Sequence, residues 1–103
     1  MKIAIAVIKK EEGSEISSQA GRAPYYLIFS EKGELLEAIS NPFAIGGGGA
    51  GIAVAKMLAD KNVDIVIAGA VGGNMAAALE EKGIKYHEKQ GIAKEVLQEV
   101  INT

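Results

Sequence analysis

The sequence predicts an α/β protein with a largely parallel β-sheet and helices on both of its faces. Residues 2–8 are apolar on both alternating faces, as expected for a strand in the middle of a covered sheet. The second half of the chain alternates strand-like and helix-like segments, which is typical of β-α-β units. Because crossovers between parallel strands are right-handed, we expect the helices to cover both faces of the sheet.

The first half of the chain supplies the central strand and a hairpin. Residues 2–8 form the strand, and the polar residues 11–19 indicate an exposed loop. We expect residues 25–29 and 35–39 to pair as antiparallel strands, because Gly33 supplies the positive φ that a short turn needs. The hairpin therefore adds one antiparallel strand to the sheet.

The second half supplies the remaining strands and the helices. A helix follows the glycine-rich run and ends near residues 61–62, and Gly83 has the position of a C′ cap for the next helix. Residues 2–8 and 63–68 should be adjacent parallel strands, because both are apolar on both faces. The other expected elements are a helix at residues 75–82, a short strand at 84–86 and an amphipathic helix at 92–101.

The composition indicates one soluble domain over residues 1–103. This length allows a hydrophobic core without metals or disulfides. The absence of cysteine excludes a disulfide framework and any cysteine-ligated metal site, and the net charge of −2 argues against binding to nucleic acid. The apolar run at the N-terminus lacks a cleavage site, so we expect no signal peptide.

The uncharged stretch at residues 38–55 does not predict a membrane span. Asn41, Pro42 and the glycines within it remove the hydrophobicity that a spanning helix needs. We therefore expect a cytoplasmic protein without a membrane partner, and a monomer.

The glycine run at residues 46–49 is the most informative feature of the chain. Glycine is costly in conformational entropy unless the backbone needs positive φ or a close approach. Because a helix follows, free N–H groups and the positive helix end could hold an anionic ligand; a pliable hinge is the alternative. The run lacks the Lys-Ser/Thr ending of a nucleoside triphosphatase loop and the acidic partner of a dinucleotide-binding fingerprint.

Three loops should meet at one edge of the sheet, at the C-terminal ends of the parallel strands. These loops are residues 9–22, 42–51 and 69–74, and open α/β sheets bind ligands at this edge. Arg22, the one arginine, suits capture of a carboxylate or phosphate. Asn74 is expected either to cap the helix that follows it or to present its amide to the ligand.

The residues give little support to catalysis or to a metal site. The serines within residues 14–18 have no evident histidine or aspartate partner. His87 is the one histidine and is expected to be an exposed loop residue, because metal sites generally gather several ligands. Met57 and Met75 fall on helices and are expected in the core. We predict no catalytic residue and no metal ligand.

An ordered set of motifs resembles the dinitrogenase iron-molybdenum cofactor biosynthesis family, which includes NifX-type proteins, the NafY cofactor-binding domain and the C-terminal part of NifB. The resemblance covers essentially the whole chain and identifies it as a small stand-alone member. The motifs are Gly21 to Tyr26, then Asn41-Pro42 with the run at 46–51, then Val63 to Gly69 leading through Gly72 and Asn74 to Leu79, and Gly83 to Lys85.

The resemblance implies a three-layer α/β/α, ribonuclease H-like fold with a five-stranded mixed sheet. It also implies non-catalytic binding or carriage of an anionic iron–sulfur or iron-molybdenum cluster, or a precursor, with a cluster-assembly protein as partner and a role accessory to nitrogen fixation. The family often has His-Phe before Gly-Arg, where this chain has Gln19-Ala20 and so lacks that histidine. The candidate ligand-binding residues are Gln19, Gly21, Arg22, Gly46, Gly47, Gly48, Gly49, Gly72, Gly73 and Asn74.

Two other functions stay open on the sequence. The same loops and Arg22 would serve an enzyme or sensor that acts on a phosphorylated small molecule. An interaction module would instead use the glycine edge to contact the backbone of a partner protein. In each case we expect the three loops to be mobile without a ligand, because glycine loops make few buried contacts.

Overall fold

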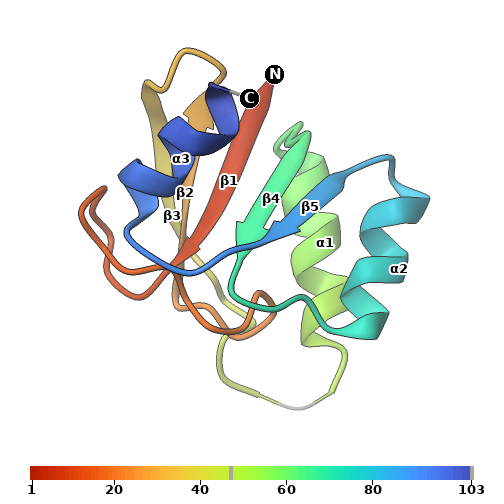
Figure 1. Ribbon diagram of the computed structural model, residues 1–103. Helices are drawn as coiled ribbons and strands as arrows, with labels where there is room; N and C mark the ends of the chain where they lie inside the picture. The colour runs from red at the N-terminus through yellow and green to blue at the C-terminus, as the bar shows by residue number, and fades with distance from the viewer. Residues whose placement is uncertain (47, 103) are drawn as a thin grey trace.

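The computed structural model describes residues 1–46 and 48–102, and it consists of a five-stranded mixed sheet with helices on both faces (Figure 1). This is the three-layer α/β/α arrangement of a ribonuclease H-like motif, as expected. The elements in chain order are β1 (Lys2–Val7), β2 (Tyr25–Ser30), β3 (Leu35–Ser40), α1 (Ala50–Asp60), β4 (Ile65–Ala68), α2 (Gly73–Glu81), β5 (Lys85–Glu88) and α3 (Ala93–Ile101).

β1 is the central strand of the sheet, whose strand order is β3-β2-β1-β4-β5. It pairs antiparallel with β2 and parallel with β4, with Ile3 opposite Ile65 and Ile5 opposite Ile67. The prediction that residues 2–8 and 63–68 form adjacent parallel strands is therefore confirmed. β5 continues the parallel part, and β3 lies antiparallel to β2 at the other edge.

The two faces of β1 contact different helices and have side chains of different size. Ile3, Ile5 and Val7 pack in one buried cluster with residues of α3. Ala4 and Ala6 pack in the other, with residues of α1 and α2. Figure 1 shows α3 on one side of the sheet and the pair α1 and α2 on the other. The small alanine side chains suit this second face because they leave room for two helices.

Backbone geometry at the turns and helix ends follows the sequence closely. Gly33 has φ of 87° in the β2–β3 turn, and Gly83 has φ of 73° directly after the C-cap of α2, as predicted. The N–H groups of Gly83 and Ile84 donate to the carbonyls of Glu80 and Leu79, which is the hydrogen-bond pattern of a Schellman motif. Asn62, with φ of 62°, ends α1 in the same way.

Two expectations for local structure were wrong. Asn74 lies inside the first turn of α2, and Gly72 is the N-cap, because the helix begins before the position that its side chain could cap. Residues 11–19 do not form a uniformly exposed loop: Ser14, Ile16 and Ser17 are buried. Val7 forms an isolated bridge with Ile16, so this segment folds back on the end of β1.

The start of β1 and the C-terminal end of α3 lie at the end of the sheet opposite the three loops (Figure 1). The N-terminal amino group lies 3.9 Å from the Glu31 carboxylate in the β2–β3 turn, which marks the same end. His87 is exposed, as expected, but it belongs to β5 and not to a loop. No helix in the described part of the chain is long and apolar enough to cross a membrane.

Candidate ligand-binding site at the glycine loops

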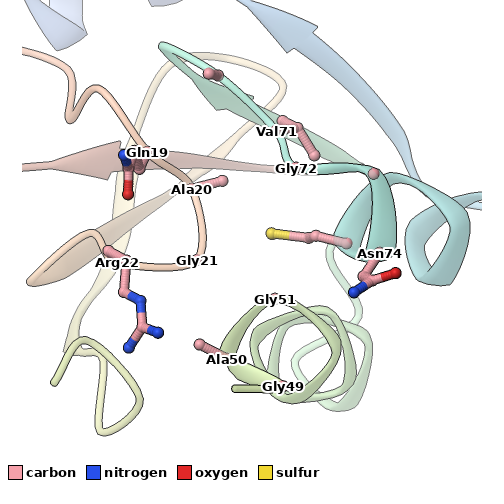
Figure 2. A pocket seen from close by; sticks show the side chains of 13 residues that line it. Gln19, Ala20, Gly21, Arg22, Gly49, Ala50, Gly51, Val71, Gly72 and Asn74 are labelled. Atoms are coloured by element: carbon pink, nitrogen blue, oxygen red, sulfur yellow. The ribbon is translucent and has the colours of Figure 1, made fainter. Parts of the chain in front are cut away.

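The three loops meet around a cavity of about 410 Å³ at the C-terminal edge of the parallel strands (Figure 2). Figure 2 shows Gln19 and Arg22 on one side of this cavity and Asn74 on the other. Its lining residues are Gln19, Ala20, Gly21, Arg22, Gly49, Ala50, Gly51, Ala70, Val71, Gly72, Gly73, Asn74 and Met75.

The N-termini of α1 and α2 form two walls of the cavity. Gly49 is the N-cap of α1 with φ of 85°, and Gly72 is the N-cap of α2. No described side chain caps either helix, and neither first turn contains an acidic residue. Each helix end carries the equivalent of about half a positive elementary charge. The cavity therefore lies at two positive helix ends, where backbone N–H groups need acceptors.

Glycine allows the walls to approach one another closely. A Cβ atom at Gly51 would lie 2.8 Å from Cβ of Met75, so the first turns of α1 and α2 can meet only if residue 51 has no side chain. A Cβ atom at Gly21 would lie 3.3 Å from the backbone nitrogen of Gly51. The loop that carries Arg22 thus lies directly against the N-terminus of α1.

Hydrogen bonds hold the loop that carries Arg22. The buried Tyr26 hydroxyl donates to the Ala20 carbonyl at 2.6 Å, and the backbone nitrogen of Ala20 donates to the Ala70 carbonyl at 2.9 Å. The Asn41 side chain donates to the carbonyls of Gly21 and Ala23. The expectation of few buried contacts is therefore wrong for this loop. Burial also raises the pKa of the Tyr26 phenol far above its ordinary value of about 10.

Arg22 connects this loop to the glycine run. Its Nη1 donates to the carbonyl oxygen of Gly46 at 2.9 Å. Arg22 is exposed, and among the described residues that line the cavity it is the one with a charged side chain. Its positive charge adds to that of the two helix ends.

The predicted residues divide into those that line the cavity and those that do not. Gln19, Gly21, Arg22, Gly49, Gly72, Gly73 and Asn74 all line it. Gly46 and Gly48 instead line a neighbouring hollow with Pro42, Phe43 and Ile45, and Gly47 lies outside the described residues. The other lining residues were not named individually as candidates, although all except Met75 lie in the three predicted loops: Ala20, Ala50, Gly51, Ala70, Val71 and Met75.

A family model described as dinitrogenase iron-molybdenum cofactor matches residues 1–103 of this sequence. The chain belongs to this family. The family assignment agrees with the resemblance carried by the ordered motifs, and it covers the whole of the chain that forms the sheet and the cavity.

Solved structures confirm the fold of this dinitrogenase iron-molybdenum cofactor family member. The apo form of the orange protein from Desulfovibrio gigas is 23% identical with a TM-score of 0.91, over 98% of this chain and 87% of that one. A Thermotoga protein described as a candidate NifB protein is 27% identical with a TM-score of 0.83, over 98% and 87%. A candidate dinitrogenase from Methanocaldococcus jannaschii is 17% identical with a TM-score of 0.66, over 99% and 88%. Comparison with curated proteins gave no significant match.

The donor set of this family member is poor in metal ligands. No group of three or more histidine, cysteine, aspartate or glutamate side chains that could hold a metal ion occurs within residues 1–46 and 48–102. His87 lies on β5 and does not line the cavity. The cavity instead offers the amide side chains of Gln19 and Asn74, the Arg22 guanidinium and the helix ends, all of which can donate hydrogen bonds.

Proposed function

We propose that the protein is a non-catalytic binding or carrier protein for an anionic ligand, a metal cluster or its precursor, held in the cavity between α1 and α2. The observation that carries this proposal is the pair of helix N-termini without side-chain caps around one cavity, with Arg22 beside them. Helix N-termini bind phosphate, sulfate and carboxylate groups in many proteins through the same N–H groups and dipole.

The lining of the cavity favours binding over catalysis. The described lining residues include no serine, cysteine, histidine, lysine, aspartate or glutamate, so they supply neither a nucleophile nor a general base. The volume of about 410 Å³ lies within the range of small-ligand sites, which is about 300 to 1,000 Å³. Such a cavity can hold and orient a ligand by hydrogen bonds.

The chemistry of the donors also indicates the kind of ligand. N–H groups donate hydrogen bonds to oxygen or sulfur atoms, whereas a bare metal ion needs ligand atoms with lone pairs. The proposed ligand is therefore an anion whose metal is already coordinated and whose outer atoms are oxygen or sulfur. A cluster of this kind would be bound through its surface, without a bond from the protein to the metal.

The expected binding free energy differs between small anions and larger ones. A helix end contributes about 0.3 to 1 kcal/mol, and a hydrogen bond from Arg22 to an anion about 1.5 to 3 kcal/mol. These terms support dissociation constants of about millimolar or weaker for a simple oxyanion. Tighter binding requires a larger anion that contacts more of the cavity wall.

The test is an amide titration of ¹⁵N-labelled protein with phosphate, molybdate and tetrathiomolybdate, a soluble anion with sulfur on its surface. We expect shifts to concentrate at Gly21, Gly51 and residues 70–75, with tetrathiomolybdate binding more tightly than phosphate. Arg22→Ala should weaken binding about tenfold or more, since it removes a charged hydrogen bond. His87→Gln is the control and should bind like the wild type.

Two results would count against the proposal. Shifts that concentrate at the opposite end of the sheet would place the ligand elsewhere. Loss of binding in His87→Gln but not in Arg22→Ala would indicate metal coordination on β5. Selective binding of phosphate would instead favour the alternative of a protein that acts on a phosphorylated small molecule, for which the same helix ends are suited.

A further inference from the structure

The carboxylate of Glu88 is hydrogen-bonded to a residue in the wall of the cavity. It is the last residue of β5 and does not itself line the cavity. Its Oε2 accepts a hydrogen bond from the backbone nitrogen of Val71 at 2.9 Å. Val71 does line the cavity and lies two positions before Gly73, the first residue of α2.

The fold fixes Glu88 in this position. Glu88 is opposite Ala68 in the parallel pairing of β4 with β5, and the backbone nitrogen of Lys89 donates to the Ala68 carbonyl at 2.8 Å. A Cβ atom at Gly69 would lie 2.8 Å from Nε2 of Gln90, so the Gln90 side chain also lies against this loop. Residues 88–90 thus hold the loop that leads from β4 into α2.

A carboxylate near a helix N-terminus interacts favourably with the positive end of the helix. The first turn of α2 contains no acidic residue, so Glu88, which belongs to another element, supplies a carboxylate beside this helix end. An anion in the cavity would interact with the same positive potential and would be repelled by Glu88. The charge of Glu88 therefore opposes binding of the proposed ligand.

We infer that the negative charge of Glu88 lowers the affinity of the cavity for anions, while its hydrogen bond to Val71 holds the cavity wall in place. This inference rests on the proposed function and deepens it, because it concerns affinity at the same site. It assigns to an edge-strand residue outside the cavity a role in setting how tightly anions bind.

The test separates the charge of Glu88 from its hydrogen bond. Glu88→Gln keeps an acceptor oxygen but removes the charge, and Glu34→Gln makes the same charge change in the β2–β3 turn at the opposite end of the sheet. Dissociation constants for tetrathiomolybdate are measured by amide titration at low and high salt. Hydrogen exchange at the Val71 amide is compared in the wild type and Glu88→Gln to check that the hydrogen bond is kept.

We expect Glu88→Gln to bind the anion about two- to fivefold more tightly than the wild type at low salt. The difference should shrink at high salt, because exposed charges are screened. Glu34→Gln should change affinity much less. If the wild type binds but Glu88→Gln binds no more tightly than Glu34→Gln, the inference is wrong and the proposed function stands. If neither the wild type nor Glu88→Gln binds any of the anions, both are wrong.

Discussion

At the scale of single residues, Tyr26 connects the core to the cavity. Its ring is fully buried in the sheet layer, and its hydroxyl donates to Ala20, which lines the cavity. Ala20 in turn donates to Ala70 in the neighbouring loop. One phenol oxygen thus supports the contact between two of the three loops.

Replacing Tyr26 with phenylalanine should destabilise the fold. The Tyr26→Phe variant keeps the ring but leaves the Ala20 carbonyl without its 2.6 Å donor, so we expect a loss of about 1 to 3 kcal/mol in the free energy of unfolding. Urea denaturation measures this loss. Tyr25→Phe, at a half-buried position on the same strand, is the control, with an expected change within about 0.5 kcal/mol. Equal losses in both variants would contradict the role given to the Tyr26 hydroxyl.

The same phenol predicts a pH dependence of stability. Burial raises the pKa of Tyr26 in the folded state, so the folded protein retains the proton where the unfolded chain loses it. This contribution to stability is complete below pH of about 10 and is lost at higher pH, by up to about 1.4 kcal/mol per unit. The stability advantage of the wild type over Tyr26→Phe should therefore shrink between about pH 9 and about pH 11. An advantage that stays constant over this range would contradict the prediction.

The sequence predicted those site residues whose type is itself informative, namely the arginine and the glycines. Arg22 and the glycines at 72 and 73 were predicted and do line the cavity. Ala20, Ala70 and Val71 were not singled out, although they lie in two of the predicted loops, because alanine and valine carry no polar side chain that would indicate a ligand site. The expected capping role of Asn74 was wrong because α2 begins at Gly73, so Asn74 is the second residue of the helix and Gly72 is its N-cap.

At the scale of elements, the close approach of α1 and α2 depends on Gly51. Their first turns meet where a Cβ atom at residue 51 would lie 2.8 Å from the Met75 side chain. The sequence predicted both helices but not this contact, because glycine before a helix equally suits a turn. In the structure, Gly51 lies at the contact between α1 and α2.

A methyl group at residue 51 should therefore separate these helices. We expect Gly51→Ala to lower the free energy of unfolding by about 1 to 3 kcal/mol, because the gain in helix propensity does not offset the overpacking. Gly73→Ala is the matched control: a Cβ atom there meets no atom within 4 Å, so the variant should be neutral or up to about 1 kcal/mol more stable. Urea denaturation compares the two. A Gly51→Ala variant as stable as the wild type would show that the contact is unimportant.

The edge strands also carry features that hinder pairing with another sheet. The register of β3 against β2 shifts between Ile28 and Phe29, which indicates a bulge near the exposed Leu36. β5, at the other edge, has the sequence Lys-Tyr-His-Glu and is mostly exposed. Bulges and charged residues both disfavour edge-to-edge association. These features disfavour pairing of either sheet edge with the edge of another sheet.

At the scale of the whole molecule, two apolar clusters stabilise the fold, one on each face of the sheet. Residues of α1 and α2 pack on one face, and residues of α3 on the other. The alternation of apolar residues in β1 predicted this arrangement, since both of its faces needed cover. No group of potential metal ligands in the described chain contributes to either cluster.

Metal removal should consequently leave the fold unchanged. We expect the midpoint of thermal unfolding in EDTA to equal that in buffer, because the hydrophobic clusters account for the stability without a bound ion. Adding zinc should not raise the midpoint, whereas a ligand that binds the folded state would do so by mass action. A fall of the midpoint in EDTA would point to a structural metal and require a new assignment of its ligands.

The start of β1 and the end of α3 lie at the side of the molecule opposite the cavity, so a segment fused to either would begin far from the cavity. A tag, a linker or another domain joined at either end would extend away from the glycine loops. Protein immobilised on a sensor surface through either terminus would present its cavity to the solution. The same geometry would let this fold serve as one domain of a longer chain while its cavity stays accessible to a ligand.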